Sequence, residues 1–156
     1  LQVLSLELIL GSRTLGQQSI SQNLGVKVEL NTVGDYQMFA NERDNKNYDI
    51  FVGGWFSDYN DPLDFLNVMK TGVYDSYGLY SNSEYDSLID SLTGENDNAK
   101  RLEIYQKLED LLVAQDCGVA PLYYSDKHYY YQNWVKDFYT SSFGASQELY
   151  RASVQK

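Results

Sequence analysis

Apolar residues divide the chain into short stretches that predict strands alternating with helices. Residues 3–10 form an apolar run of strand length that ends at Gly11. Residues 26–30 alternate strictly between apolar and polar side chains, which is typical of a half-buried strand. Residues 48–52 are aromatic and β-branched, which suits an interior strand. The polar stretch at residues 14–23 is expected to form a short helix between the first two strands.

Helical spacing dominates the middle of the chain. Asp35 can cap a helix over residues 36–43. Residues 81–84 (SNSE) have the pattern of a capping box, and apolar residues follow at helical spacing. A longer amphipathic helix is predicted over residues 99–114. Its core-facing side is expected to carry Leu102, Tyr105, Leu108 and Leu112.

Two aromatic stretches follow these helices. Residues 119–124 are predicted to be a strand, with Pro121 favouring an edge position, and residues 128–131 form a second aromatic run. Strands separated by helices indicate an α/β sheet covered by helices. A chain of 156 residues with 43% apolar content can bury one core, so a single domain is expected over residues 1–156.

The third predicted strand leads into a group of residues with binding chemistry. Two glycines, Trp55 and three aspartates follow it within a short stretch, and no basic residue lies near them in the sequence. Because open α/β sheets bind ligands beyond the ends of their strands, Trp55 is expected to line a cleft. A cation for the aspartates is expected to come from outside this segment.

The three aspartates have different expected roles. Asp61 precedes Pro62 and is predicted to cap the helix that begins there, and Asp64 suits the first turn of that helix. Asp58 has no such role, which leaves a paired-carboxylate hydrolase, a calcium loop or a receptor for a ligand ammonium. The calcium-loop pattern is missing, and spacing alone does not identify a carboxyl with a raised pKa.

Composition narrows the class of ligand. The net charge of −10 and the scattered basic residues argue against nucleic acid and favour a polar or cationic ligand. The 15 tyrosines suit wet binding clefts as well as cores. Cys117 is the only cysteine, which excludes an internal disulfide and a cysteine-based zinc cluster, and it is expected to be a small buried side chain. His128 has no nucleophile pattern near it and is interpreted as a surface or packed histidine.

No apolar run approaches the roughly 18 residues of a membrane span, and no signal-peptide pattern is present. The chain begins at Leu1 rather than at methionine, so we interpret it as a piece of a longer protein.

Residues 48–62 (YDIFVGGWFSDYNDP) closely resemble the extracellular solute-binding proteins of peptide ABC transporters, solute-binding protein family 5, and among them the oligopeptide-binding proteins. Residues 80–89, the Arg101–Tyr105 pair and residues 119–124 (VAPLYY) extend the likeness. It covers roughly residues 6–151 and corresponds to the C-terminal lobe of that family. The resemblance implies one α/β lobe of a type II periplasmic-binding-protein fold, with a mixed sheet flanked by helices and hinge closure of two lobes on the ligand.

The resemblance also implies a binder without a cofactor rather than an enzyme. In such proteins an extended peptide lies between the lobes, and an aspartate three residues after a tryptophan holds its α-ammonium. That aspartate corresponds to Asp58, with Trp55 lining the pocket. Val52 stands where some relatives have an arginine, which leaves the preferred peptide length open. The full set of implied ligand contacts is Gly54, Trp55, Phe56, Ser57, Asp58 and Tyr59.

The implied partners are peptides, the permease subunits of an ABC importer and the N-terminal lobe of the same chain. Nucleic acid and metal are not expected. The implied location is extracellular or periplasmic, with a lipoprotein anchor outside these residues. Three alternatives stay open: a non-peptide solute such as a nickel complex, haem or a sugar; a peptide-pheromone receptor; and a hydrolase using Asp58 and Asp61.

Overall fold

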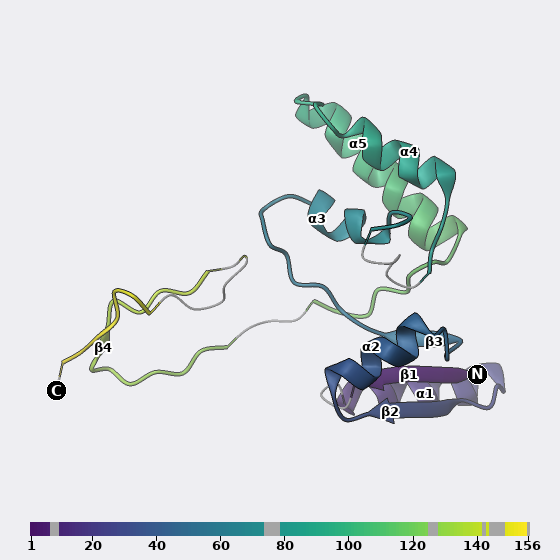
Figure 1. The fold of residues 1–156 in the computed structure, drawn as a ribbon, viewed down its shortest axis with the longest axis horizontal. Coiled ribbons are helices and arrows are strands. Elements are labelled where there is room, and N and C mark those ends of the chain that lie inside the picture. The colour runs from purple at the N-terminus through teal and green to yellow at the C-terminus, as the bar shows by residue number, and fades with distance from the viewer. Residues whose placement is uncertain (7–9, 74–78, 125–127, 142, 144–148, 156) are drawn as a thin grey trace. The chain divides into compact units, whose positions relative to one another are not determined.

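The computed structural model describes residues 1–6, 10–73, 79–124, 128–141, 143 and 149–155 (Figure 1). The chain forms two compact units, Leu1–Trp55 and Phe56–Lys156. Each unit has its own secondary structure and its own buried residues.

The first unit is built on a three-stranded parallel sheet (Figure 1). The strands lie in the order β2-β1-β3, so Leu4 of the central strand pairs with Asn31 on one side and with Phe51 on the other. Parallel neighbours need crossover connections, which the two helices of this unit supply. The elements are β1 (Gln2–Leu6), α1 (Leu10–Leu24), β2 (Glu29–Val33), α2 (Tyr36–Asp44) and β3 (Ile50–Val52). The predicted α/β class, with a sheet flanked by helices, is confirmed.

The core of the first unit lies between the sheet and α2. Leu4, Val33 and Phe39 are buried together, and Tyr48 and Phe51 pack against them. The ring of Phe51 meets the ring of Phe39 edge-on at 6.2 Å and that of Tyr48 at 5.4 Å between centroids. Such edge-to-face aromatic pairs contribute beyond their buried area. The aromatic residues predicted at the third strand therefore hold α2 on the sheet.

Element boundaries in the first unit differ from the predicted ones. The predicted cap of α2 is confirmed, because Oδ1 of Asp35 accepts the Met38 N–H at 2.9 Å. Helix α1 begins at Leu10, earlier than the polar stretch indicated. Strand β2 begins at Glu29 rather than at residue 26, because pairing starts where Gln2 of β1 meets Glu29.

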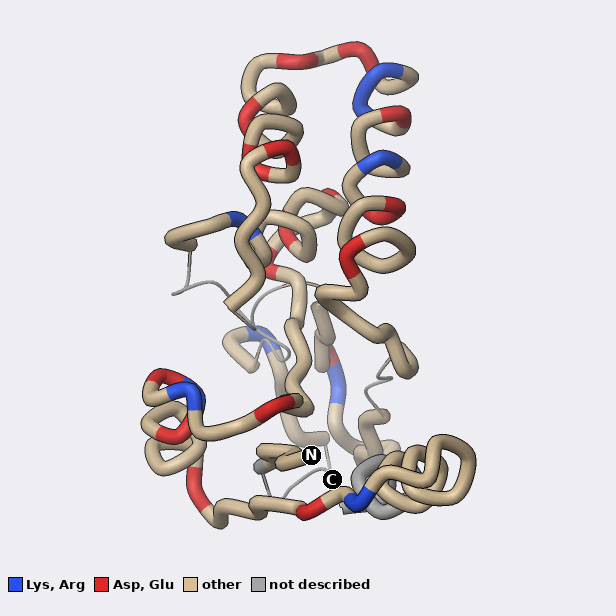
Figure 2. The backbone as a smooth tube through the Cα atoms, turned by 90° about the vertical axis from the view of Figure 1, so that its right-hand side faces the viewer, with Lys and Arg blue, Asp and Glu red and all other residues tan. Residues whose placement is uncertain are grey.

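The second unit is helical around its core. Helices α4 and α5 pack against each other, and α3 packs against α5 (Figure 1). Figure 2 shows acidic residues along α4 and both signs of charge along α5. The elements are α3 (Leu63–Leu66), the 3₁₀ helix η2 (Asn67–Met69), α4 (Ser83–Ser91), α5 (Asn98–Glu109) and the π-helical segment η3 (Asp110–Gln115). The buried residues of these helices include Leu66, Val68, Met69, Tyr85, Ile89, Tyr105, Leu108, Leu111 and Leu112.

The caps of α4 and α5 come from residues next to the predicted starts. The side-chain oxygen of Asn82, rather than that of Ser81, accepts the N–H groups of Glu84 and Tyr85 at 2.8 and 3.2 Å. Asp97 caps α5 in the same way, by accepting the N–H of Ala99 at 2.9 Å. Asparagine is as good an N-cap as serine, so the predicted helix forms with its start shifted by one residue.

The predicted inward face of α5 is wrong at Leu102, which is 57% exposed. Tyr105, Leu108 and Leu112 are buried as predicted. The position toward the interior one turn before Tyr105 is taken instead by Arg101, whose side chain is only 19% exposed. Residues four apart share a helix face, so Arg101 lies on the same buried face as Tyr105. The spacing of hydrophobic residues could not predict this position, because Arg101 is charged.

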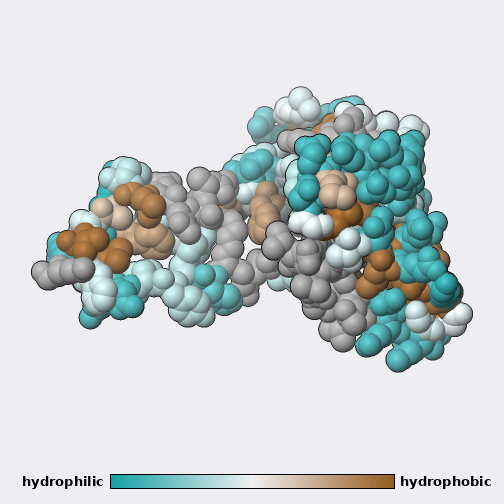
Figure 3. All heavy atoms as spheres, turned by 60° about the horizontal axis from the view of Figure 1, so that its bottom comes forward, coloured by the Kyte–Doolittle hydropathy of each residue, from teal (hydrophilic) through white to brown (hydrophobic). Residues whose placement is uncertain are grey.

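The end of the second unit differs most from its prediction. Residues 119–124 are not a strand, and Tyr124 is 98% exposed. No described strand pairs with them, and the described strands beyond them, β4 (Val135–Lys136) and β5 (Ser153–Val154), form a short antiparallel pair. Figure 3 shows apolar side chains at the surface of this C-terminal part, at the left of the view.

Cys117 is exposed, so the expected buried thiol is wrong. The helical segment η3 ends at Gln115, and Cys117 adopts a positive φ of 51° in the turn that follows. A residue in such a turn lacks the sheet neighbours that would have buried it. His128 is exposed, which agrees with its interpretation as a surface histidine.

Candidate functional site

The predicted contact segment, Gly54 to Tyr59, begins shortly after β3 ends at Val52. Gly54 and Trp55 end the first unit, and the residues from Phe56 onward begin the second. Trp55 is half-buried, whereas Phe56 and Tyr59 are exposed. The segment follows a strand, as predicted, but the expected interior strand is wrong, because β3 lies at the edge of the three-stranded sheet and Ile50 is 41% exposed. The contacts of the segment with a ligand stay a prediction.

A buried carboxylate fixes the backbone of this segment. The side chain of Asp64, in the first turn of α3, belongs to a residue that is 7% exposed. Its Oδ2 accepts the backbone N–H of Asp58 at 2.6 Å. A buried charge is costly unless hydrogen bonds satisfy it, so this contact stabilises the carboxylate and the loop together.

Asp61 joins the start of α3 to α5. Its Oδ1 accepts the Leu63 N–H at 2.8 Å and the Tyr105 hydroxyl at 2.5 Å, and its Oδ2 accepts from Nη2 of Arg101 at 2.8 Å. Nη1 of Arg101 also donates to the backbone oxygens of Leu92 and Glu95. These three side chains, Asp61, Arg101 and Tyr105, are called the Asp61 cluster below. Arg101 is the cation that the sequence led us to expect from outside the segment.

The electrostatics of the Asp61 cluster keep Asp61 ionised. Burial disfavours its charged form, but the hydrogen bonds from Tyr105 and Leu63 and the charge of Arg101 outweigh burial and hold the pKa of Asp61 below its ordinary value. Burial and the hydrogen bond to Asp61 raise the pKa of Tyr105 to about 12. An aspartate with a lowered pKa and this set of donors serves as a structural anion and is a poor general acid.

The helix-start role predicted for Asp61 is confirmed by its bond to Leu63, although α3 itself begins after Pro62. The first-turn position predicted for Asp64 is also confirmed. Sequence reasoning missed the bond from Asp64 to Asp58 and the two partners of Asp61 on α5. The four-residue spacing of Arg101 and Tyr105 was the available signal for the latter, since it places both on one helix face.

Asp58 differs from both of these aspartates. Its side chain is exposed, and its carboxylate makes no hydrogen bond or ion pair with any residue that the structure describes. Its backbone, in contrast, is held by Asp64. The carboxylate of Asp58 is therefore exposed to solvent while its backbone is held in place. The carboxylates of Asp61 and Asp64 form hydrogen bonds within the protein.

A second polar cluster connects the start of α4 with the end of η3. Oδ2 of Asp116 accepts the Tyr80 hydroxyl and the Asn82 amide, both at 2.7 Å. These two hydrogen bonds lower the pKa of Asp116, and burial followed by the bond to Asp116 raises the pKa of Tyr80. Gly118 packs on the Tyr80 ring so closely that an added Cβ would lie 2.7 Å from Cδ2. This cluster is structural, since its polar groups bind one another.

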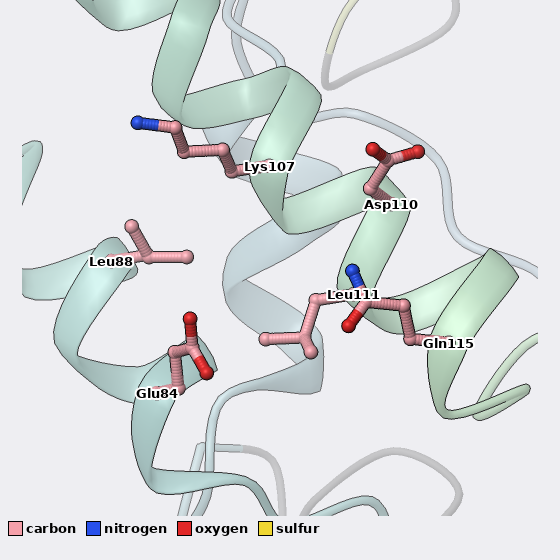
Figure 4. A pocket seen from close by; sticks show the side chains of 6 residues that line it. All are labelled: Glu84, Leu88, Lys107, Asp110, Leu111 and Gln115. Carbon is pink, nitrogen blue, oxygen red and sulfur yellow. The ribbon is translucent and has the colours of Figure 1, made fainter.

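A cavity of about 330 Å³ lies between α4 and the continuous α5–η3 helix (Figure 4). Figure 4 shows Glu84 and Leu88 on α4 with the Leu111 side chain extending toward them, whereas the Asp110 carboxylate points away from them. None of the predicted contact residues lines it. Within the described ranges, no group of three or more metal-ligating side chains is present. None of the helices that the structure describes has the length and apolar content to cross a bilayer.

No protein-family model matches the chain. The oligopeptide-binding protein OppA of Bacillus subtilis is 32% identical over 123 residues, which are 78% of this chain and 21% of that protein. The periplasmic oligopeptide-binding protein OppA of Salmonella typhimurium is 32% identical over 73% of this chain and 21% of its own length. The substrate-binding domain of an oligopeptide ABC transporter from Bacillus anthracis matches the whole chain with a TM-score of 0.84 at 26% identity, over 31% of that structure.

The chain spans about a fifth of the length of these curated relatives. Both relatives carry the names of binding proteins rather than enzymes, and the α/β fold of the chain matches part of the solved substrate-binding domain. The chain therefore belongs to the oligopeptide-binding family of ABC-transporter solute-binding proteins.

Proposed function

We propose that residues 1–156 are part of the C-terminal lobe of the substrate-binding component of a peptide ABC importer. In this proposal an extended peptide binds between this lobe and an N-terminal lobe of the same protein. The relatives named for oligopeptides and the parallel α/β sheet support the proposal. Its partners are peptides and the permease subunits of the importer. Its location is the periplasm or the cell surface, with a lipoprotein anchor outside these residues.

The ligand contact of the proposal is Asp58, which receives the α-ammonium of the peptide. The observation that carries this assignment is the contrast among the aspartates: Asp61 and Asp64 are bound within the protein, and the carboxylate of Asp58 has no partner among the described residues. A charge-assisted hydrogen bond to an ammonium is stronger than a neutral one and fixes the register of the peptide. The accompanying contacts are Gly54, Trp55, Phe56, Ser57 and Tyr59.

The hydrolase alternative has less support. It requires Asp58 and Asp61 to act as an acid–base pair, in which one carboxyl has a raised pKa. The pKa of Asp61 is lowered instead, and both of its oxygens accept hydrogen bonds from Tyr105, Leu63 and Arg101. The binding role is therefore the better interpretation of the site.

Calorimetry on the full-length protein containing residues 1–156 tests the proposal. The probes are penta-alanine with a free N-terminus and its N-acetylated form. Because a hydrogen bond to a charged group contributes about 1.5–3 kcal/mol, Asp58→Asn should weaken binding of the free amine about 10- to 100-fold. The acetylated peptide should lose little. Glu103→Gln removes the same charge from an exposed position on α5 and should leave both affinities unchanged.

Two results would contradict the proposal. Equal affinity of wild-type protein for the free and acetylated peptides would exclude an ammonium receptor, and an unchanged affinity in Asp58→Asn would move the receptor elsewhere. Residues 1–156 alone supply one side of the proposed cleft and should show negligible affinity. Micromolar binding by this isolated chain would exclude a site that needs both lobes.

A further inference from the structure

Asp64 is a buried acidic residue that is not among the proposed ligand contacts. We infer that Asp64 is a positioning residue that sets the direction of the Asp58 carboxylate toward the ligand amine. This inference rests on the proposed function and extends it to a residue that touches no ligand.

The geometry begins with the bond between the two residues. Oδ2 of Asp64 lies 2.6 Å from the backbone nitrogen of Asp58, across six residues of chain. The side chain of Asp58 leaves the same residue toward solvent. Fixing its N–H restricts the backbone rotation of Asp58, and the allowed side-chain rotamers depend on that rotation. The carboxylate of Asp58 is therefore directed by Asp64 without a contact between the two carboxylates.

Helix α3, which carries Asp64, is held in place by hydrogen bonds at both of its ends. Asp64 is in the first turn of α3, whose backbone is tied to α5 through the Asp61 cluster. At the other end of α3, the carbonyl oxygen of Leu66 accepts the hydroxyl of the fully buried Tyr85 at 2.8 Å. Both ends of this short helix are thus hydrogen-bonded to buried residues of the second unit. Because α3 is held in this way, Asp64 holds the backbone of Asp58 in a fixed position relative to those residues.

The chemistry of the acceptor favours positioning over simple loop closure. A loop N–H at an exposed residue can bond to water at little cost, whereas burying a carboxylate is costly unless it is compensated. A side chain that is ordered before binding loses less freedom when the ligand arrives, which increases affinity.

Substitutions at Asp64 separate positioning from charge. Asp64→Asn keeps an oxygen at the same reach and removes the charge. Asp64→Ser is one atom shorter, so its oxygen cannot take the acceptor position at 2.6 Å. Asp64→Ala removes the acceptor entirely. Positioning predicts that the asparagine variant is close to wild type and that the serine and alanine variants are impaired.

The experiment measures the ratio of affinities for free and N-acetylated penta-alanine in the full-length protein. We expect Asp64→Ala and Asp64→Ser to lower this ratio about tenfold and Asp64→Asn to keep it within about threefold of wild type. A purely structural role would reduce both affinities together and leave the ratio unchanged. Asp64→Ser retains a polar side chain of smaller volume and provides the comparison if the alanine variant does not fold.

The outcomes separate the inference from the proposal on which it rests. If wild-type protein does not prefer the free amine, the proposed function fails and the inference fails with it. If Asp58→Asn abolishes the preference but Asp64→Ser and Asp64→Ala retain it, the proposed function stands and the inference is overturned. If Asp64→Asn loses the preference as fully as Asp64→Ala, the charge of Asp64 and not its hydrogen bond is responsible, which also overturns positioning.

Discussion

The helices from α3 to η3 and the residues from 119 onward are both rich in tyrosine, but they use it differently. In the helical part, the hydroxyls of Tyr85, Tyr105 and Tyr80 bond to the Leu66 carbonyl, to Asp61 and to Asp116. In the C-terminal part, Tyr124 and Tyr130 are almost fully exposed. A buried tyrosine needs a partner for its hydroxyl, and the helical part supplies these partners at its caps and turns. In the helical part, these three tyrosines therefore join the fold through their hydroxyls, whereas Tyr124 and Tyr130 expose their side chains to solvent.

The largest expected change in stability follows from removing Tyr85 in the helical part, with removal of Tyr124 in the C-terminal part as the comparison. Tyr85→Ala empties a fully buried site and should lower the free energy of unfolding by ~3–5 kcal/mol. Tyr85→Phe keeps the ring but leaves the Leu66 carbonyl without its donor, and should cost ~1–2 kcal/mol. Tyr124→Ala should change stability by less than about 0.5 kcal/mol. Urea unfolding measures all three, and a similar loss in Tyr124→Ala and Tyr85→Ala would refute the contrast.

A smaller effect is expected at Gly118, where the turn after η3 meets Tyr80. The Cβ of Gly118→Ala would lie 2.7 Å from Cδ2 and 3.1 Å from Cε2 of the Tyr80 ring, so the ring that binds Asp116 has to move. We expect a destabilisation of ~1–3 kcal/mol. Gly16→Ala is the matched control, because Gly16 lies in α1 with open space at its Cβ. That variant should stabilise by ~0.5–1 kcal/mol, since alanine is the better helix former. Equal melting temperatures for the two variants would contradict the assignment.

The smallest expected effect is a pH dependence from the Asp61 cluster. The pKa of Asp61 is lower in the folded protein than its ordinary value of about 3.9. Its contribution to stability is therefore fully present above that ordinary value and is lost as the pH falls through the lower folded pKa. Part of the Asp61 side chain is exposed, so solvent limits the size of the effect.

Unfolding measured between about pH 5 and pH 2 should show a shallower loss of stability in Asp61→Asn than in wild type. Asp116 also has a lowered pKa, so a residual acid dependence is expected in that variant. Identical pH profiles for Asp61→Asn and wild type would show that Asp61 is not a source of acid sensitivity.

Local sequence signals predicted much of the fold. The cap at Asp35, the helix after residue 82 and the buried face of Tyr105, Leu108 and Leu112 follow from capping and periodicity, and the structure confirms them. These signals act within one or two helical turns. The strand predicted at residues 119–124 is absent, because a strand depends on a neighbouring strand that local sequence does not specify.

The candidate site was predictable in part for the same reason. The helix-start roles of Asp61 and Asp64 follow from their positions around Pro62. The pairing of Asp61 with Arg101 spans 40 residues of sequence, and charge alone does not identify which cation closes it. The bond from Asp64 back to Asp58 depends on the path of the loop, which no local pattern specifies. The structure therefore distinguishes the exposed Asp58 carboxylate from those of Asp61 and Asp64 more clearly than the sequence does.

The commitment of Asp61 and Asp64 to the protein also has an evolutionary consequence. Loss of the Asp61 acceptor removes a hydrogen bond at the start of α3, and loss of the Asp64 acceptor removes one from the preceding loop, so stability constrains both. Asp58 makes no such contribution through its side chain, and surface substitutions of that kind usually change stability little. If Asp58 is the proposed ligand contact, selection on the ligand can change residue 58 with little effect on the stability of the fold. Under the proposed ligand contact, a single substitution at residue 58 would therefore suit a ligand of different charge while Asp61 and Asp64 keep their hydrogen bonds.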